Sequence, residues 1–256
     1  MRTLAPDVDV RDGAAEAMTV RRPAPVKLWA TLGAVAVVVQ AWAYIAWFAT
    51  GEATPTPTGV DPVPTATKVW AWTLQIVMVV GAVAIVGWAV RKCLRERRLV
   101  FDGILVIVWV LQFVWDPVIN YLRPLFFYNS YLINLGVWVN HIPGWSSPNA
   151  NLLPEPLVFI GGFYLAFGMG VTVFVSGIMR VAKRRWPQFG LVRLVAIAFT
   201  AIFVADFISE VVFVRAGLYA YPGAIRELTL WAGHTYQFPI YEPFFVAPNL
   251  TALATL

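Results

Sequence analysis

The sequence is poor in two kinds of residue that many soluble proteins rely on. Only one of its 256 residues is cysteine, Cys93, so no disulfide can form within the chain, and we interpret it as an apolar packing residue. Charged residues make up 13% of the chain, whereas hydrophobic residues make up 59%. A soluble core of this length does not need so much apolar surface, but helices that face lipid do. The composition therefore predicts an all-α, polytopic membrane protein.

Motifs that bind nucleotides or activate nucleophiles are also missing. There is no Walker A sequence, no GxGxxG after a predicted strand, no GxSxG and no paired Asp-rich diphosphate motif. The two histidines, His141 and His234, could join carboxylates around a metal, but no HxxE or HxxxH spacing supports such a site. We therefore predict neither a cofactor nor a metal. Basic residues cluster at span ends without interleaved aromatics, so nucleic acid is not an expected partner.

Long apolar runs are abundant, and they predict the membrane topology. A helix needs roughly 20 apolar residues to cross a bilayer. Six runs are read as spans: 27–49, 68–90, 102–119, 154–179, 190–214 and 240–256. We predict one transmembrane helical domain over residues 26–256, preceded by a disordered cytoplasmic tail over residues 1–25. The last run ends without a charged flank, as expected either of a short final helix or of a chain cut inside a helix.

The basic residues orient these six runs. Fifteen of the 19 lysines and arginines fall in the tail and in the second-to-third and fourth-to-fifth connections. Because cytoplasmic loops carry an excess of Lys and Arg, this places the N-terminus in the cytoplasm of a cell membrane. The outer connections, 50–67, 117–153 and 215–239, are long, which is uncommon for loops without a function. We expect them to fold over the outer helix ends and form the site there.

Five carboxylates lie within or beside the predicted spans, where ionisable groups are costly and typically functional. They are Asp116, Glu155, Asp206, Glu210 and Glu242. The predicted topology gathers all five in the outer half of the bundle, although they belong to four different helices. We therefore predict that they are the catalytic residues.

The two acids of the fifth predicted span form the sharpest local pattern. Asp206 and Glu210 are four residues apart, so they share one face of a helix. Two acids that close in low dielectric are not both ionised, and the neutral one can act as a general acid. The alternative is a structural pair bonded to another helix or to a residue such as Arg215 or Gln112.

Each of the other three acids directly precedes a proline. Proline suits the first turn of a helix, so Glu155 and Glu242 are expected at helix N-termini, where the helix dipole favours an ionised carboxylate. Asp116 is expected at the C-terminal end of its helix, where the dipole acts in the opposite sense. The alternative for the two glutamates is that they only cap exposed backbone N–H groups.

Polar and aromatic residues beside these acids are candidate substrate contacts. Some follow Asp116 and others lead into Glu242. They are Asn120, Tyr121, Tyr128, Asn129, Trp138, His141, Trp145, His234, Tyr236, Gln237 and Tyr241. For the tryptophans and tyrosines the alternative is an aromatic belt at the membrane interface.

A series of short motifs runs through the same loops. In order they are Trp115-Asp116-Pro117, Asn120-Tyr121, Tyr128-Asn129, Gly136, Trp138, Pro143-Gly144-Trp145, Glu155-Pro156, Asp206, Glu210, Gly217, Tyr219, Tyr221, Tyr236-Gln237, Pro239 and Tyr241-Glu242-Pro243. The series resembles the AveC family of membrane spirocyclases, named for avermectin biosynthesis. The likeness runs from the first predicted span to the last residue. One departure is Val137, where family members commonly carry serine between glycine and tryptophan.

The resemblance implies acid catalysis with no redox step, in bacterial antibiotic biosynthesis. A polyketide ketone with two hydroxyl-bearing arms would close into a spiroketal of one configuration, and some relatives are also associated with dehydration of the product ring. A neutral acid must protonate the departing hydroxyl, and an ionised carboxylate can stabilise the oxocarbenium ion. Our hypothesis gives the first role to the Asp206/Glu210 pair, with Asp116 as its closest partner, and the second to Glu155 and Glu242. The residues expected to orient the substrate hydroxyls are Asn120, Tyr128, Asn129 and Gln237.

Two other functions fit the same residues. A transporter or exporter of a hydrophobic metabolite would use the intramembrane acids as a proton relay, although we find no internal repeat of the kind many transporters show. A membrane cyclase of a prenylated substrate would use the same acids and aromatic rings. The expected partners are a hydrophobic polyketide substrate and the lipid bilayer, and the sequence favours no particular oligomeric state.

Overall fold

The fold is given by a computed structural model that describes residues 24–120, 125–148 and 150–255. The chain divides into two compact units, residues 1–39 and 40–256. The described part of the first unit is the beginning of helix α2 (Ala24–Ala49), which includes the last two residues of the predicted tail. The rest of the predicted tail lies outside the described residues. The remaining elements belong to the second unit.

Four helices are long and apolar enough to cross a membrane. They are α2 from Pro25 onward, α3 (Thr65–Glu96), a continuous helix over Phe159–Arg185, and α7 (Leu191–Arg215). The continuous helix consists of α5 (Phe159–Phe163), a π-helical segment η4 (Tyr164–Met169) and α6 (Gly170–Arg185). Much of the apolar surface of these helices is exposed, as contact with lipid requires. The predicted all-α membrane class agrees with this architecture.

The third and sixth predicted spans form shorter helices. α4 covers Phe101–Phe113 and α8 covers Pro243–Thr255, 13 residues each, which corresponds to about 20 Å against the roughly 30 Å of a bilayer core. α4 stops early because Pro117 has no N–H to bond to the carbonyl of Phe113. The chain tightens there into the 3₁₀ helix η1 (Asp116–Asn120). Among the described residues, four helices therefore have spanning length, not six.

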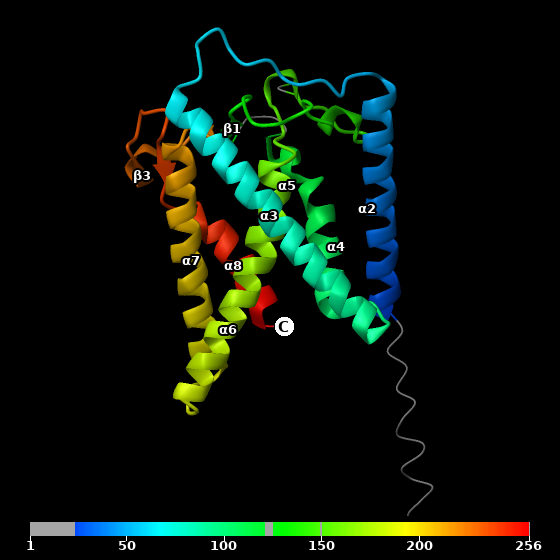
Figure 1. Ribbon diagram of the computed structural model, residues 1–256, viewed down its shortest axis with the longest axis vertical. Coiled ribbons are helices and arrows are strands. Elements are labelled where there is room, and N and C mark those ends of the chain that lie inside the picture. The colour runs from blue at the N-terminus through cyan, green and yellow to red at the C-terminus, as the bar shows by residue number, and fades with distance from the viewer. Residues whose placement is uncertain (1–23, 121–124, 149, 256) are drawn as a thin grey trace, which may run out of the picture. The chain divides into compact units, whose positions relative to one another are not determined.

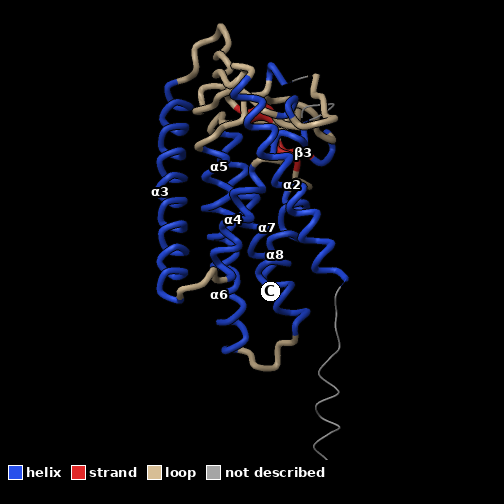
Figure 2. The backbone as a smooth tube through the Cα atoms, turned by 90° about the vertical axis from the view of Figure 1, so that its right-hand side faces the viewer, coloured by secondary structure: helices blue, strands red, loops and turns tan. Residues whose placement is uncertain are grey.

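Within the second unit, the long connections gather at one end of the helices, as Figures 1 and 2 show. Two antiparallel ladders order them: β1 (Phe127–Tyr128) pairs with β2 (Tyr219–Ala220), and β3 (Thr229–Leu230) pairs with β4 (Phe238–Pro239). The 3₁₀ helices η2 (Val139–His141), η3 (Ala150–Leu152) and η5 (Arg226–Leu228) complete them. The β1–β2 ladder places Tyr128 opposite Tyr219 and so joins two loops that are far apart in the sequence.

Side chains then fasten these loops to the helix ends. Asn129 Nδ2 donates to the carbonyl of Gly217, 2.8 Å away, and Gln75 of α3 accepts a hydrogen bond of 2.9 Å from the N–H of Ile133. Gly217 has φ +73°, a left-handed conformation that ends α7 and that glycine adopts without strain. These hydrogen bonds join the loops to the helix ends, over which they were expected to fold.

The basic connections lie at the opposite end of the same helices (Figure 1). One follows α3 and the other follows α6, whose last turn contains Lys183, Arg184 and Arg185. The structure therefore separates basic loops from long loops, as the charge pattern requires. Which end faces the cytoplasm stays a prediction.

Candidate active site

A cavity of about 200 Å³ lies beneath the loops, at their junction with α5, α7 and α8. Its wall combines four carboxylates with eight aromatic rings and three aliphatic side chains. The lining residues are Asp116, Ile119, Phe126, Tyr128, Phe159, Ile160, Phe163, Tyr164, Asp206, Glu210, Phe213, Tyr219, Tyr221, Glu242 and Val246. Polar chemistry is thus concentrated inside a largely apolar enclosure.

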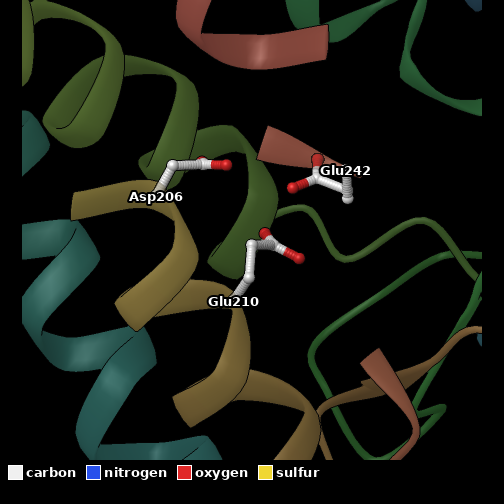
Figure 3. A group of neighbouring side chains, drawn as sticks. All are labelled: Asp206, Glu210 and Glu242. Atoms are coloured by element: carbon white, nitrogen blue, oxygen red, sulfur yellow. The ribbon is translucent and has the colours of Figure 1, made fainter. Parts of the chain in front are cut away.

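Three of the acids form one group, which we call the acid triad: Asp206, Glu210 and Glu242. One oxygen of each lies within 4.8 Å of the others, and Figure 3 shows the three carboxyl groups directed toward a common space. Asp206 and Glu210 come from one face of α7, and Glu242 immediately precedes the first residue of α8. The packing of α7 against α8 therefore completes the group. Three oxygens at this spacing could also hold a metal ion, so the absence of a metal stays a prediction.

Hydrogen bonds within the acid triad distinguish its members. The Tyr221 hydroxyl donates to Glu210 Oε2 over 2.7 Å, and the Tyr219 hydroxyl is also hydrogen-bonded to Glu210. Asp206 Oδ2 and Glu242 Oε2, by contrast, are buried without a hydrogen-bond partner among the described residues. Three carboxyl groups this close are not all ionised in a buried site, because their charges repel each other.

The remaining two acids form a second group, the acid pair Asp116 and Glu155. Asp116 Oδ1 accepts a hydrogen bond of 2.7 Å from Tyr164, and its Oδ2 accepts one of 3.0 Å from Tyr128. The Glu155 carboxyl is close enough to Asp116 for the two to act on each other's pKa, and it does not line the cavity. Glu155 is 2% exposed, so this pair is shielded from solvent.

No described basic side chain neutralises these groups. Among the described residues, none of the ion pairs includes one of the five acids. Arg215, considered above as a partner of Asp206 and Glu210, instead lies over the ring of Tyr236, 4.3 Å from its centroid. Burial of several carboxylates without a counter-charge is costly, and protonation is one way to reduce that cost.

Three of the acids lie outside the four long apolar helices, and burial raises the pKa of each. Burial raises the pKa of Glu242, and the charges of Glu210 and Asp206 raise it further. Burial also raises the pKa of Glu155, with the Asp116 charge acting in the same direction. For Asp116 burial again raises the pKa, but the hydrogen bonds from Tyr164 and Tyr128 oppose that shift. Of these three acids, Glu155 and Glu242 therefore hold a proton most readily, whereas ionised roles were expected for them.

The structure brings four of the five predicted acids to one cavity and places the fifth, Glu155, directly behind Asp116. Two details of the hypothesis change. Glu242, not Asp116, is the closest partner of the Asp206/Glu210 pair. Glu242 does sit at a helix N-terminus, whereas Glu155 lies four residues before α5 begins. The catalytic role of each acid stays a prediction.

Of the predicted substrate contacts, Tyr128 lines the cavity. Asn129 and Gln237 bond to backbone carbonyls of Gly217 and Tyr221, and Trp138 is fully buried with its Nε1 donating to the Val114 carbonyl. The others outside the cavity wall are His141, Trp145, His234, Tyr236 and Tyr241. The side chain of Asn120 and all of Tyr121 lie outside the described residues.

Several cavity residues were not predicted as site residues. Tyr219 and Tyr221 belong to the motif series, but only the β1–β2 ladder reveals that they face the same space as Tyr128. Tyr164 lies inside an apolar run, where a lone phenol is the only sequence signal. Its position depends on the π-helical segment, which the hydrophobic pattern does not predict.

The comparison with protein families decides the relationship. The sequence profile described as Spirocyclase AveC-like matches residues 96–256. The chain belongs to the AveC-like spirocyclase family. The match includes all five acids but begins only at the last residue of α3, so it is shorter than the likeness drawn from the motifs. No curated protein and no solved structure matches the chain.

Proposed function

We propose that this family member is a spirocyclase that needs no cofactor and that folds a dihydroxyketone polyketide into one spiroketal isomer. The observation that carries the proposal is the cavity, in which carboxyl groups from α7, from the residue before α8 and from η1 converge inside an aromatic wall. Spiroketal formation needs a proton donor, a proton acceptor and a shape that folds the substrate. The cavity offers all three.

The reaction divides into two additions and one loss of water. One hydroxyl adds to the ketone to give a hemiketal. Its new hydroxyl then takes a proton and leaves as water, which produces an oxocarbenium ion, and the second hydroxyl captures this cation while it loses its own proton. The net change is ketodiol to spiroketal plus water, so no electrons are exchanged. General acid–base catalysis of such steps contributes about 10²–10⁴-fold.

We assign the proton donor to Glu242. Its raised pKa keeps it neutral near physiological pH, and its carboxyl group lies within 4.8 Å of those of Asp206 and Glu210. Glu210, which accepts hydrogen bonds from Tyr219 and Tyr221, supplies negative charge beside the developing cation. Aromatic faces such as Phe159 stabilise the same charge by cation–π attraction.

The size of the cavity suggests what is enclosed. A volume of about 200 Å³ is below the roughly 300–1,000 Å³ of pockets that bury a drug-sized ligand. The cavity therefore suits the reacting core of the substrate, with the rest of a polyketide chain lying outside it. Because the apolar helices face lipid, a bilayer-dissolved substrate could reach the cavity sideways.

The test is an in vitro reaction with the purified protein in nanodiscs and a synthetic dihydroxyketone. Products are resolved by chiral chromatography, and their masses show whether a second water is lost by dehydration. We expect one dominant isomer, formed faster than the spontaneous reaction and lost in Glu210→Gln. Glu227→Gln, at an exposed position of η5, is the matched control.

The spontaneous isomer mixture, formed at the spontaneous rate, would favour the transporter. Proton-coupled uptake of the metabolite into vesicles would then test that function. Turnover of a polyene epoxide alone would favour the prenyl-type cyclase.

We also propose that the site faces the outside of the cell membrane and that the N-terminus is cytoplasmic. The support is the separation of basic connections from long loops at opposite ends of the second unit. In a Cys93→Ala background, a Thr58→Cys variant should react with an impermeant thiol reagent added outside intact cells. Reaction only after cell lysis would reverse the orientation.

A further inference from the structure

The acid pair contains a carboxylate, Asp116, that accepts a hydrogen bond on each of its two oxygens. Asp116 begins η1, just beyond the end of α4, and receives one phenol from β1 and one from the continuous helix Phe159–Arg185. These two tyrosines, Tyr128 and Tyr164, bond different oxygens of the same carboxyl group. Glu155 approaches from the loop before α5.

The hydrogen-bond partners of the two carboxyl groups indicate which of them carries the proton. Asp116 accepts from a phenol on each oxygen, which favours its ionised form. Glu155 Oε1 is buried without a hydrogen-bond partner among the described residues, and burial together with the Asp116 charge raises the pKa of Glu155. Glu155 therefore holds the proton of the pair, and the negative charge lies on Asp116. That carboxylate lines the cavity, whereas Glu155 does not.

The position of Tyr164 depends on a special piece of backbone. It is the first residue of the π-helical segment, and such segments occur mostly as single turns at functional sites. A π turn inserts one extra residue, which rotates the following helical face by about 100° relative to the preceding one. The helix can thus present Tyr164 to Asp116 at one level and pack Gly168 against the ring of Trp109 one turn later.

We propose that Tyr164 is a positioning residue that, together with Tyr128, holds Asp116 as the general base of the site while Glu155 stores the adjoining proton. The inference rests on the proposed function. As the hydroxyl of the substrate forms its C–O bond, its proton moves to Asp116. The acid triad meanwhile gives a proton to the departing hydroxyl, so one proton is taken up and one released. Asp116 then passes its proton through the released water to Glu242, which resets both groups.

Other titratable groups around the pair do not offer a competing base. Tyr44 of α2 lies near Glu155, and Glu210 faces Asp116 across the cavity. Glu210 is already bonded to two phenols, and its charge acts equally in a variant of Tyr164. A change caused by removing the Tyr164 hydroxyl can therefore be attributed to Asp116.

The test compares Tyr164→Phe with wild type over a range of pH. Loss of one phenol donor raises the pKa of Asp116, and the base works only when ionised, so the acid limb of the kcat profile should move upward by about one pH unit. At a given pH on the acid limb, we expect kcat to fall about tenfold with KM nearly unchanged, because the hydroxyl acts on a reacting group. Tyr131→Phe, which removes a phenol outside the cavity, is the control and should leave the limb in place. A loss of kcat without movement of the acid limb would contradict the proposal.

A second measurement does not depend on turnover. Infrared titration of the protein in lipid detects the carbonyl band of protonated carboxyl groups. At neutral pH, Glu155→Gln should remove one such band and Asp116→Asn should not. The reverse pattern would place the proton on Asp116 and overturn the inference. If wild type fails to cyclise the dihydroxyketone but shows the expected bands, the proposed function fails and the charge assignment stands.

Discussion

The two groups of acids meet at one cavity, which Asp116 and the acid triad line, but their hydrogen bonds differ. In the acid pair, both oxygens of Asp116 accept hydrogen bonds from phenols. In the acid triad, Asp206 Oδ2 and Glu242 Oε2 are buried without a hydrogen-bond partner among the described residues, as is Oε1 of Glu155 beside Asp116. A carboxylate with filled hydrogen bonds is suited to hold charge, whereas a carboxyl group with a free oxygen is suited to exchange a proton. Similar residues thus acquire different roles from their partners.

The largest effect is expected from Glu242→Gln. The amide cannot donate an acidic proton, so kcat should fall about 10²–10⁴-fold while substrate binding persists. Single-turnover kinetics with the dihydroxyketone measure the change. Retained turnover in a folded variant would remove the acid triad from its proposed role, and Glu227→Gln controls for loss of a surface charge.

Removing one phenol from each group tests whether the groups act separately. Tyr221→Phe removes the donor to Glu210 and should lower kcat about tenfold, as Tyr164→Phe does for the acid pair. The residues share no hydrogen-bonded carboxylate, so the double variant should show the sum of both free-energy changes within about 0.5 kcal/mol. A larger coupling would mean that the two groups are one network.

Each group of acids should control one limb of the dependence of kcat on pH. Because burial and neighbouring charges raise the pKa of Glu242, its neutral form persists above the ordinary carboxyl range, and activity should fall only as the pH rises through that raised value. Activity should fall on the acid side as Asp116 becomes protonated. We expect a bell-shaped dependence of kcat on pH, with the alkaline limb absent from the residual activity of Glu242→Gln. An alkaline limb that persists would point to another donor.

The smallest effect on activity is expected from a glycine substitution that changes the helix packing near Tyr164. A Cβ at Gly162 would lie 2.6 Å from Cβ of Met78, whereas one at Gly161 would meet Phe113 at 3.9 Å. Gly162→Ala should therefore lower the free energy of unfolding by about 1–3 kcal/mol and disturb Tyr164 two residues later, while Gly161→Ala should be nearly neutral. Thermal unfolding and the acid limb of the pH profile report the two consequences. Equal behaviour of the two variants would contradict the close approach.

The same contrast shows what sequence could predict. The spacing of Asp206 and Glu210 placed them on one helical face, and the cost of burying charge marked all five acids as candidates. Which acid joins which group depends on the packing of α7 against α8 and on the β1–β2 ladder, which are contacts between distant segments. Hydrophobic periodicity carries no information about either.

Other differences have local causes. Pro117 shortened the third predicted span, because its missing N–H ends α4. Asn129 and Gln237 have side chains that satisfy backbone carbonyls of the loops, a role that composition does not distinguish from substrate binding. Tyr164 was not predicted as a site residue, because its neighbours in the sequence are apolar and because a π-helical turn has no periodic signature.

The most direct test of the account is the stereochemical outcome of the reaction in nanodiscs. A synthetic dihydroxyketone is converted by wild type, Glu242→Gln and Glu227→Gln, and the spiroketals are separated by chiral chromatography. The account predicts one dominant isomer, formed faster than in buffer, from wild type and Glu227→Gln, and the spontaneous mixture from Glu242→Gln. The spontaneous mixture from all three folded proteins would contradict it.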